Sequence, residues 1–184
     1  KISKNVKNMQ LTYKFKTNFN EQLSRLCKTS NNLYNQANYI IKKELNQNKK
    51  WTRYHQLNSI MQQTKTLEDD INYRLLKAQT SQQILKQLDK NWSSYFKSLK
   101  EYKIHKEKFK ACPRPPNFRK KGSEHLLIYT NQNCKIEDHY LVLSKDLKIY
   151  IPQFEQYKDR ISKFQQVRIL PRYGSYVVEI IYDV

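Results

Sequence analysis

The first clear pattern along the chain is a strict alternation of apolar and polar residues near its amino-terminal end. Met9, Leu11, Tyr13 and Phe15 are the apolar members, and glutamine, threonine and lysine stand between them. A period of two is typical of a strand with one buried face, and the opposite face here is basic. The alternation therefore predicts a half-buried strand over residues 9–16.

Helical periodicity follows this strand. Asn18 stands three residues before Glu21, a capping pattern that predicts a helix start, and apolar residues at helical spacing continue to about Asn46. A second helix is expected from Trp51. The acidic residues 68–70 are interpreted as the first turn of a short third helix, because the helix dipole favours negative charge there.

The strongest periodic stretch predicts a long helix from about Ser81 to Lys103. Three prolines at 113, 115 and 116 then end the helical pattern, because proline lacks an amide donor and restricts the residue before it. The apolar stripe of the long helix consists of Ile84, Leu85, Leu88, Trp92, Tyr95, Phe96 and Leu99.

Short segments rich in Ile, Leu, Val and Tyr follow the prolines and predict strands. Since a lone strand is not stable by itself, the first strand must pair with these later ones. We therefore expect an α+β fold in which 1–18 and 112–184 form a β-barrel or sandwich, with 19–111 inserted as a helical bundle. The predicted strands cover residues 125–131, 135–137, 140–143, 147–151, 167–170 and 176–182.

The net charge of the chain indicates the class of its partner. The 184 residues include 35 Lys and Arg against 16 Asp and Glu, which gives a formal net charge of +19. Self-repulsion of this size opposes compaction, so a polyanionic partner is expected. Disorder is the alternative, but 38% hydrophobic and 12% aromatic residues are too many for a solvated tail.

Glycine and cysteine usage excludes several classes of site. With only Gly122 and Gly174, the chain contains neither a Rossmann fingerprint nor a Walker A loop. The three cysteines show no C-x-x-C pair, which excludes a four-cysteine zinc site and favours a reducing, cytoplasmic compartment. No apolar run approaches the roughly 18 residues of a membrane-spanning helix, so no membrane partner is expected.

Four segments, in this order and spacing, carry a resemblance to a known family. They are LYNQAN at 33–38, QQILKQLDKNWSSYFK at 82–97, PRPPNFRKK at 113–121 and LIYTNQ at 127–132. Together they resemble the amino-terminal half of the OrfB/TnpB proteins of bacterial insertion sequences. Those proteins are RNA-guided DNA endonucleases related to the type V CRISPR effectors.

The resemblance implies a wedge-like β-barrel with an inserted helical recognition lobe. In the family, a closing strand like residues 176–182 leads into an RNase H-like nuclease domain with three acidic metal ligands, followed by a zinc ribbon. The sequence to Val184 contains neither, so the resemblance implies the nucleic-acid-holding half, with no cofactor in this segment and Mg²⁺ only in the nuclease domain. It also implies a bacterial or archaeal, nucleoid-associated protein.

One set of candidate residues suits base reading. Lys77, Gln82 and Lys86 stand at the start of the long predicted helix. Glutamine can hydrogen-bond adenine through two atoms, and lysine can reach base acceptors or phosphates. The resemblance implies that this helix start reads a short DNA motif beside the target, together with Tyr54. The alternative for the three helix residues is a polar surface face, and the alternative for Tyr54 is an aromatic residue of the core.

Two further sets suit the nucleic-acid backbone. A basic loop surrounds a proline-stiffened turn, where cations can neutralise phosphates at little ordering cost, and the resemblance implies that it lies near the guide RNA. A polar cluster at a strand end suits phosphates or base edges, although asparagine is also typical of turns. The two sets are Arg114, Arg119, Lys120 and Lys121, and Thr130, Asn131, Gln132 and Asn133.

We therefore expect the nucleic-acid-binding portion of a transposon-encoded RNA-guided DNA endonuclease, with a guide RNA and target DNA as partners and no catalytic centre in these residues. The alternative is a stand-alone, nuclease-deficient DNA-binding regulator derived from such a protein. A third hypothesis is a complete enzyme in which Glu68, Asp69 and Asp70 bind Mg²⁺. The sequence leaves the oligomeric state open.

Overall fold

The computed structural model describes residues 9–184, so residues 1–8 of the predicted first segment lie outside the described residues. The chain forms two compact units, a β unit made of the chain up to Cys27 with His125–Val184, and a helical unit made of Lys28–Glu124. The elements in chain order are β1 (Gln10–Asn18), α1 (Glu21–Asn48), α2 (Tyr54–Met61), α3 (Asn72–Leu75), α4 (Ala78–Ile104), η1 (Lys106–Lys108), β2 (Leu127–Thr130), β3 (Lys135–Glu137), β4 (Tyr140–Ser144), β5 (Leu147–Tyr150), α5 (Phe154–Ile161), β6 (Phe164–Arg172) and β7 (Ser175–Asp183).

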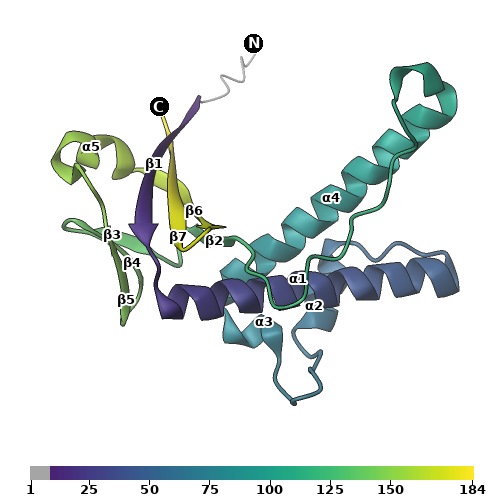
Figure 1. The fold of residues 1–184 in the computed structure, drawn as a ribbon, viewed down its shortest axis with the longest axis horizontal. Coiled ribbons are helices and arrows are strands. Elements are labelled where there is room, and N and C mark those ends of the chain that lie inside the picture. Colours follow the sequence, from purple (N-terminus) through teal and green to yellow (C-terminus); the bar gives the residue numbers. More distant parts are fainter. Residues whose placement is uncertain (1–8) are drawn as a thin grey trace, which may run out of the picture. The chain divides into compact units, whose positions relative to one another are not determined.

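The β unit contains two antiparallel sheets (Figure 1). The first has the strand order β1-β7-β6-β2, so that the amino-terminal strand pairs with the last strand, Tyr13 lying opposite Ile180. The second has the order β3-β4-β5. The predicted α+β class is confirmed, and within the described residues neither sheet closes into a barrel.

Alternation along the strands builds the core of the β unit. Successive side chains of a strand point to opposite faces, so a period of two places one set inside. The first strand contributes Tyr13 and Phe15, and Leu23 and Cys27 from the first turns of α1 are buried as well. The buried set on β7 is Tyr176, Val178, Ile180 and Tyr182.

The helix α5 was not predicted from the sequence. It has only three apolar positions, Phe154, Tyr157 and Ile161, and only Ile161 is fully buried. Its position is fixed partly by β1, because the ring of Tyr157 stacks on that of Tyr13 at 4.2 Å between centroids. The Tyr13 hydroxyl donates to the carbonyl oxygen of Pro152, just before the helix, at 2.5 Å. Contacts between distant segments therefore define this helix more than its own periodicity.

The start of α1 shows a second difference from the sequence-based expectation. Asn18 is the last residue of β1, and Asn20 is the residue that caps the helix. The Asn20 side-chain oxygen accepts the backbone N–H of Leu23 at 3.0 Å, which satisfies one of the unpaired amides of the first turn. The predicted capping residue was therefore wrong by two positions, and the helix begins at Glu21 instead of directly after Asn18.

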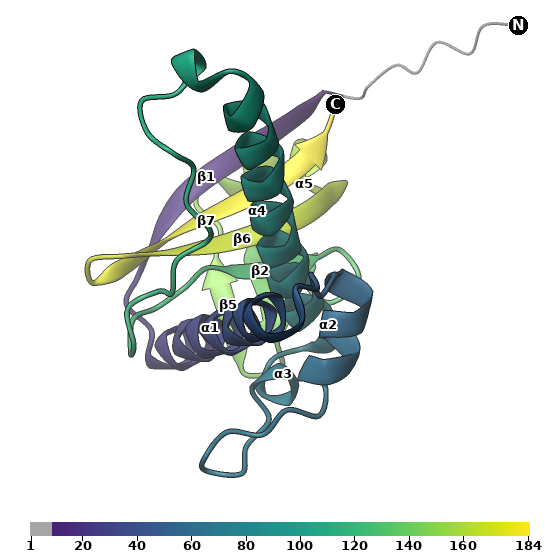
Figure 2. The ribbon, with the colours of Figure 1, turned by 90° about the vertical axis from the view of Figure 1, so that its right-hand side faces the viewer.

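The helical unit is built on the two long helices α1 and α4, and α2 and α3 both contact α4 (Figure 2). Four residues of the predicted apolar stripe of α4 are buried, namely Ile84, Leu85, Leu88 and Trp92. After α4 the chain returns along α1 as an extended segment (Figure 1). Residues 112–124, which the sequence analysis grouped with the strands, belong to this unit.

The acidic residues Glu68, Asp69 and Asp70 do not begin a helix. They lie in a turn before α3, which starts at Asn72. The Asp69 backbone has a positive φ of 67°, and its carboxylate pairs with the Lys65 ammonium at 2.7 Å. The predicted first turn is corrected to a loop, because a left-handed residue interrupts the helix there.

None of the described helices combines the length and the apolarity that crossing a bilayer requires.

Candidate nucleic-acid interface

Positive charge is concentrated on the helical unit. Residues 28–124 include 21 of the 35 Lys and Arg and 8 of the 16 Asp and Glu, a difference of +13 out of the total of +19. The β unit, from the remaining 14 basic and 8 acidic residues, carries +6. The electrostatic attraction for a polyanion is therefore greatest at the helices.

Two of the predicted base-reading residues come together on this unit. The ammonium of Lys86 on α4 lies over the ring of Tyr54, the first residue of α2, at 5.2 Å from the ring centroid. Both line an open groove of about 540 Å³ between α2 and α4, here called the α2–α4 groove. Its lining residues are Arg53, Tyr54, His55, Lys86, Asp89, Lys90 and Ser93.

Asp89 organises this groove, and sequence analysis did not single it out. Its carboxylate accepts two hydrogen bonds from the Arg53 guanidinium, at 3.1 and 3.2 Å, and the backbone N–H of Tyr54 at 3.1 Å. The third bond satisfies an amide at the start of α2, where Arg53 supplies no side-chain cap. The carboxylate on α4 therefore fixes how α2 presents Tyr54.

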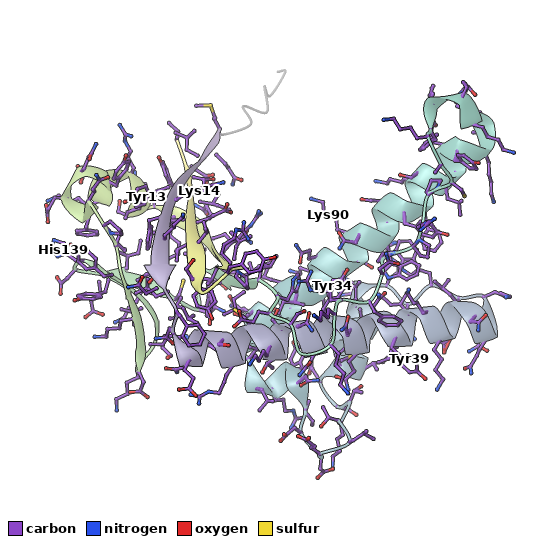
Figure 3. All side chains as sticks on the ribbon, in the orientation of Figure 1. Tyr13, Lys14, Tyr34, Tyr39, Lys90 and His139 are labelled. Atoms are coloured by element: carbon purple, nitrogen blue, oxygen red, sulfur yellow. The ribbon has the colours of Figure 1, made fainter. Side chains whose placement is uncertain are left out.

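The surroundings of Arg53 and Tyr54 favour one protonation state of each side chain. The hydrogen bonds that the Arg53 guanidinium donates to Asp89 raise the pKa of Arg53 above its usual value, so it stays charged. Burial, with a smaller contribution from Tyr73, raises the pKa of the Tyr54 phenol, so its hydroxyl remains a donor. The Arg53 guanidinium also lies over the Trp51 ring at 4.1 Å. Lys90 projects from α4 (Figure 3) and completes the basic lining.

The other two predicted base-reading residues lie outside the lining of this groove. Lys77 is the residue before α4, and Gln82 is half-buried in its second turn. Gln82 and Lys86 are four residues apart and share a helix face, whereas Lys77 is five residues before Gln82. The signal that could have found the groove is Asp89, an acidic residue that stands between Lys86 and Lys90 on α4.

The basic loop is held by asparagine side chains of α1. Residues 113–122, here called the strap, form neither helix nor strand. Asn35 pairs with one strap residue twice, because its Oδ1 accepts the backbone N–H of Arg119 at 2.8 Å and its Nδ2 donates to the Arg119 carbonyl at 2.9 Å. Asn31, one turn earlier, donates to the carbonyl of Lys120 at 3.1 Å. Side-chain amides thus replace the strand partner that an extended backbone needs.

Arg119 is an anchor of the strap. Its Nε donates to the Oδ1 of Asn31 at 3.0 Å, and one terminal nitrogen donates to the carbonyl of Glu124 at 3.1 Å. The other three cations of the predicted loop, Arg114, Lys120 and Lys121, are exposed. The structure therefore divides the predicted loop into one residue that fixes the backbone and three that face solvent.

The predicted polar cluster belongs to the β unit and forms a turn after β2. The backbone N–H of Thr130 donates to the side-chain oxygen of Asn133 at 2.8 Å, and the backbone N–H of Gln132 donates to the Thr130 hydroxyl at 3.3 Å. Two members therefore define the turn, which is the local role that such residues often have. The side chains of Asn131 and Gln132 are exposed.

Across residues 9–184, no three His, Cys, Asp or Glu side chains are grouped so as to hold a metal ion. Glu68, Asp69 and Asp70 are adjacent in sequence, but they do not form such a group. No protein-family model matches this chain, and no curated protein matches it significantly.

Proposed function

We propose that this chain is the nucleic-acid-binding portion of a transposon-encoded, RNA-guided DNA endonuclease of the OrfB/TnpB type. In this proposal the β unit corresponds to a wedge-like barrel or sandwich, and the helical unit to the recognition lobe. The helical unit holds guide RNA and helps to recognise a short DNA motif and the RNA–DNA duplex. Base pairing supplies most of the sequence choice, and the protein recognises shape and the flanking motif.

The order of the elements supports the proposal. The amino-terminal strand pairs with the carboxy-terminal strand, and all the helices of the helical unit are inserted between β1 and β2. The resemblance implies the same discontinuous arrangement. A polyanion-binding insertion on a β scaffold is consistent with both.

The observation that carries the proposal is the basic, aromatic α2–α4 groove on the more highly charged unit. Lys86 and Lys90 supply cations, and the half-buried Tyr54 supplies a ring beside them. Nucleic-acid binding sites combine cations that contact the phosphate backbone with aromatic rings on which bases stack. The groove therefore suits a nucleic-acid strand better than a small neutral ligand.

Salt dependence tests the proposal. Anisotropy titrations of the wild-type chain with a labelled RNA hairpin, between 50 and 400 mM KCl, are expected to show log affinity falling linearly with log salt. Each phosphate neutralised contributes a slope of about −0.7 to −0.9. A DNA duplex of the same sequence and equal length is titrated in parallel for comparison. A flat titration contradicts nucleic-acid binding, and a strong preference for the duplex favours the DNA-binding regulator instead.

A further inference from the structure

A second groove of the helical unit contains donors that the protein itself does not use. It lies between α4 and the strap, has a volume of about 340 Å³, and is here called the strap groove. Asn91, Ser94, Tyr95 and Ser98 line it from α4. Their spacing of three and four residues places them on one face of the helix.

The hydroxyl groups of this face are free within the part of the chain that the structure describes. Neither Ser94 nor Ser98 bonds to the carbonyl one turn earlier, the usual partner of a serine inside a helix. The Ser59 hydroxyl on α2, by contrast, donates to the carbonyl of His55 at 3.2 Å. The Tyr95 hydroxyl also has no hydrogen bond among the described residues, although its ring packs edge-on against Trp92.

A single cation stands on the opposite side of the groove. Arg114 is exposed and forms no ion pair or hydrogen bond with any described residue. Pro113 precedes it and Pro115 follows it, so the backbone on both sides is restricted before any ligand arrives. The backbone that carries Arg114 therefore loses little freedom when the guanidinium meets the oxygens of a phosphate through two parallel N–H groups.

Asn91 adds an acceptor to the lining of the groove. The Asn91 Nδ2 donates to the Tyr34 hydroxyl at 3.3 Å. The side-chain oxygen of Asn91, Oδ1, has no partner among the described residues. Tyr34 is buried where α1 and α4 meet (Figure 3). The strap groove thus presents one guanidinium, three hydroxyls that both donate and accept, and one amide oxygen.

We propose that the strap groove binds a phosphate–ribose unit of a single RNA strand, an inference that rests on the proposed function. Arg114 binds the phosphate, and the hydroxyls of Ser94 and Ser98 bind the 2′-hydroxyl, which is both a donor and an acceptor. The 2′-hydroxyl is the group by which a protein distinguishes RNA from DNA at one site. The strap groove therefore gives the chain a preference for RNA that positive charge alone does not provide.

Two oligonucleotides that differ only in the 2′-hydroxyl test this assignment. Oligo(U) and oligo(dU) of 15 nucleotides are titrated against the full chain at fixed ionic strength. The variant Ser94→Ala/Ser98→Ala is expected to weaken oligo(U) binding about 5- to 100-fold and oligo(dU) binding less than about 2-fold, because each of the two lost hydrogen bonds changes affinity about 2- to 12-fold. Arg114→Gln is expected to weaken both about equally.

The matched control is Ser59→Ala/Ser162→Ala, since both hydroxyls bond to backbone carbonyls outside the groove. This control is expected to leave both affinities within 2-fold, and thermal melts of all variants check the fold. If the Ser94/Ser98 variant retains wild-type affinity, or loses affinity for both oligonucleotides equally, the ribose assignment is overturned while the proposed function stands. If the wild-type chain binds neither oligonucleotide, both proposals fail.

Discussion

Replacing Trp92 by alanine is expected to lower the free energy of unfolding by about 3–5 kcal/mol, the largest stability effect that we predict for a single residue. Trp92 is 2% exposed in the core of the helical unit. Its indole N–H donates to the Oδ1 of Asn38 at 2.9 Å, and the Nδ2 of the fully buried Asn38 donates to the carbonyl of Pro116 at 3.1 Å. The substitution therefore creates a cavity and also leaves a buried acceptor without its partner. Urea denaturation measures the change.

Two further variants separate these contributions. Trp92→Phe keeps an aromatic ring but removes the N–H, and the unpaired Asn38 oxygen is expected to cost about 1–3 kcal/mol. Combined with Asn38→Ala, it is expected to show a coupling energy of about 0.5–3 kcal/mol. Tyr39→Ala is the control, because Tyr39 is the next residue on α1 and 57% exposed (Figure 3), and its effect is expected within about 0.5 kcal/mol. A Trp92→Ala effect as small as that of Tyr39→Ala contradicts the prediction.

The asparagine contacts show what a sequence pattern reveals and what it does not. The motif at 33–38 contributed to the resemblance, but the spacing of its residues did not predict what the side chains of Asn35 and Asn38 bind. Each is bonded to the strap, about 80 residues later in the chain: Asn35 lies 84 residues from Arg119, and Asn38 lies 78 from Pro116. Hydrogen bonds from side chains to a distant backbone have no period, so only the structure reveals them.

The elements with a wide apolar face were predictable for a clear physical reason. The stripe of α4 and the alternation of β1 each bury one face, and the period of that face identifies the element. α5 has too few apolar residues for such a signal. Its position depends on Tyr13, more than 130 residues earlier in the chain, which stacks on Tyr157 of the helix and donates to the carbonyl of Pro152 just before it. Its existence was therefore beyond sequence analysis.

The candidate site was predictable in part. The resemblance selected Tyr54 and Lys86, and the structure brings them to one groove. It did not select Asp89, whose role depends on the backbone N–H of Tyr54, 35 residues earlier. Nor did the charge of Arg119 distinguish a cation that binds its own chain from one available to a partner. Charge is visible in sequence, whereas the partner of a charge depends on the fold.

The second large effect is expected from charge reversal in the α2–α4 groove. Lys86 and Lys90 are both exposed, line the groove one helical turn apart, and form no ion pair within the described residues. The variant Lys86→Glu/Lys90→Glu is expected to weaken binding of the RNA hairpin about 10- to 100-fold at about 0.1 M salt and to reduce the magnitude of the salt slope by about two. Anisotropy titrations over the same salt range measure both quantities.

The control for this variant keeps the change in net charge but moves it. Lys145→Glu/Lys148→Glu places the same four-unit change on exposed lysines around the β4–β5 turn, in the less basic β unit. If binding is local to the groove, this variant keeps both groove lysines and their phosphate contacts, so its affinity changes less than about threefold. If the two variants lose the same affinity, the chain attracts RNA through its net charge alone, and the α2–α4 groove is not the interface. A loss confined to the groove variant, with unchanged thermal melting, assigns the phosphate contacts to Lys86 and Lys90.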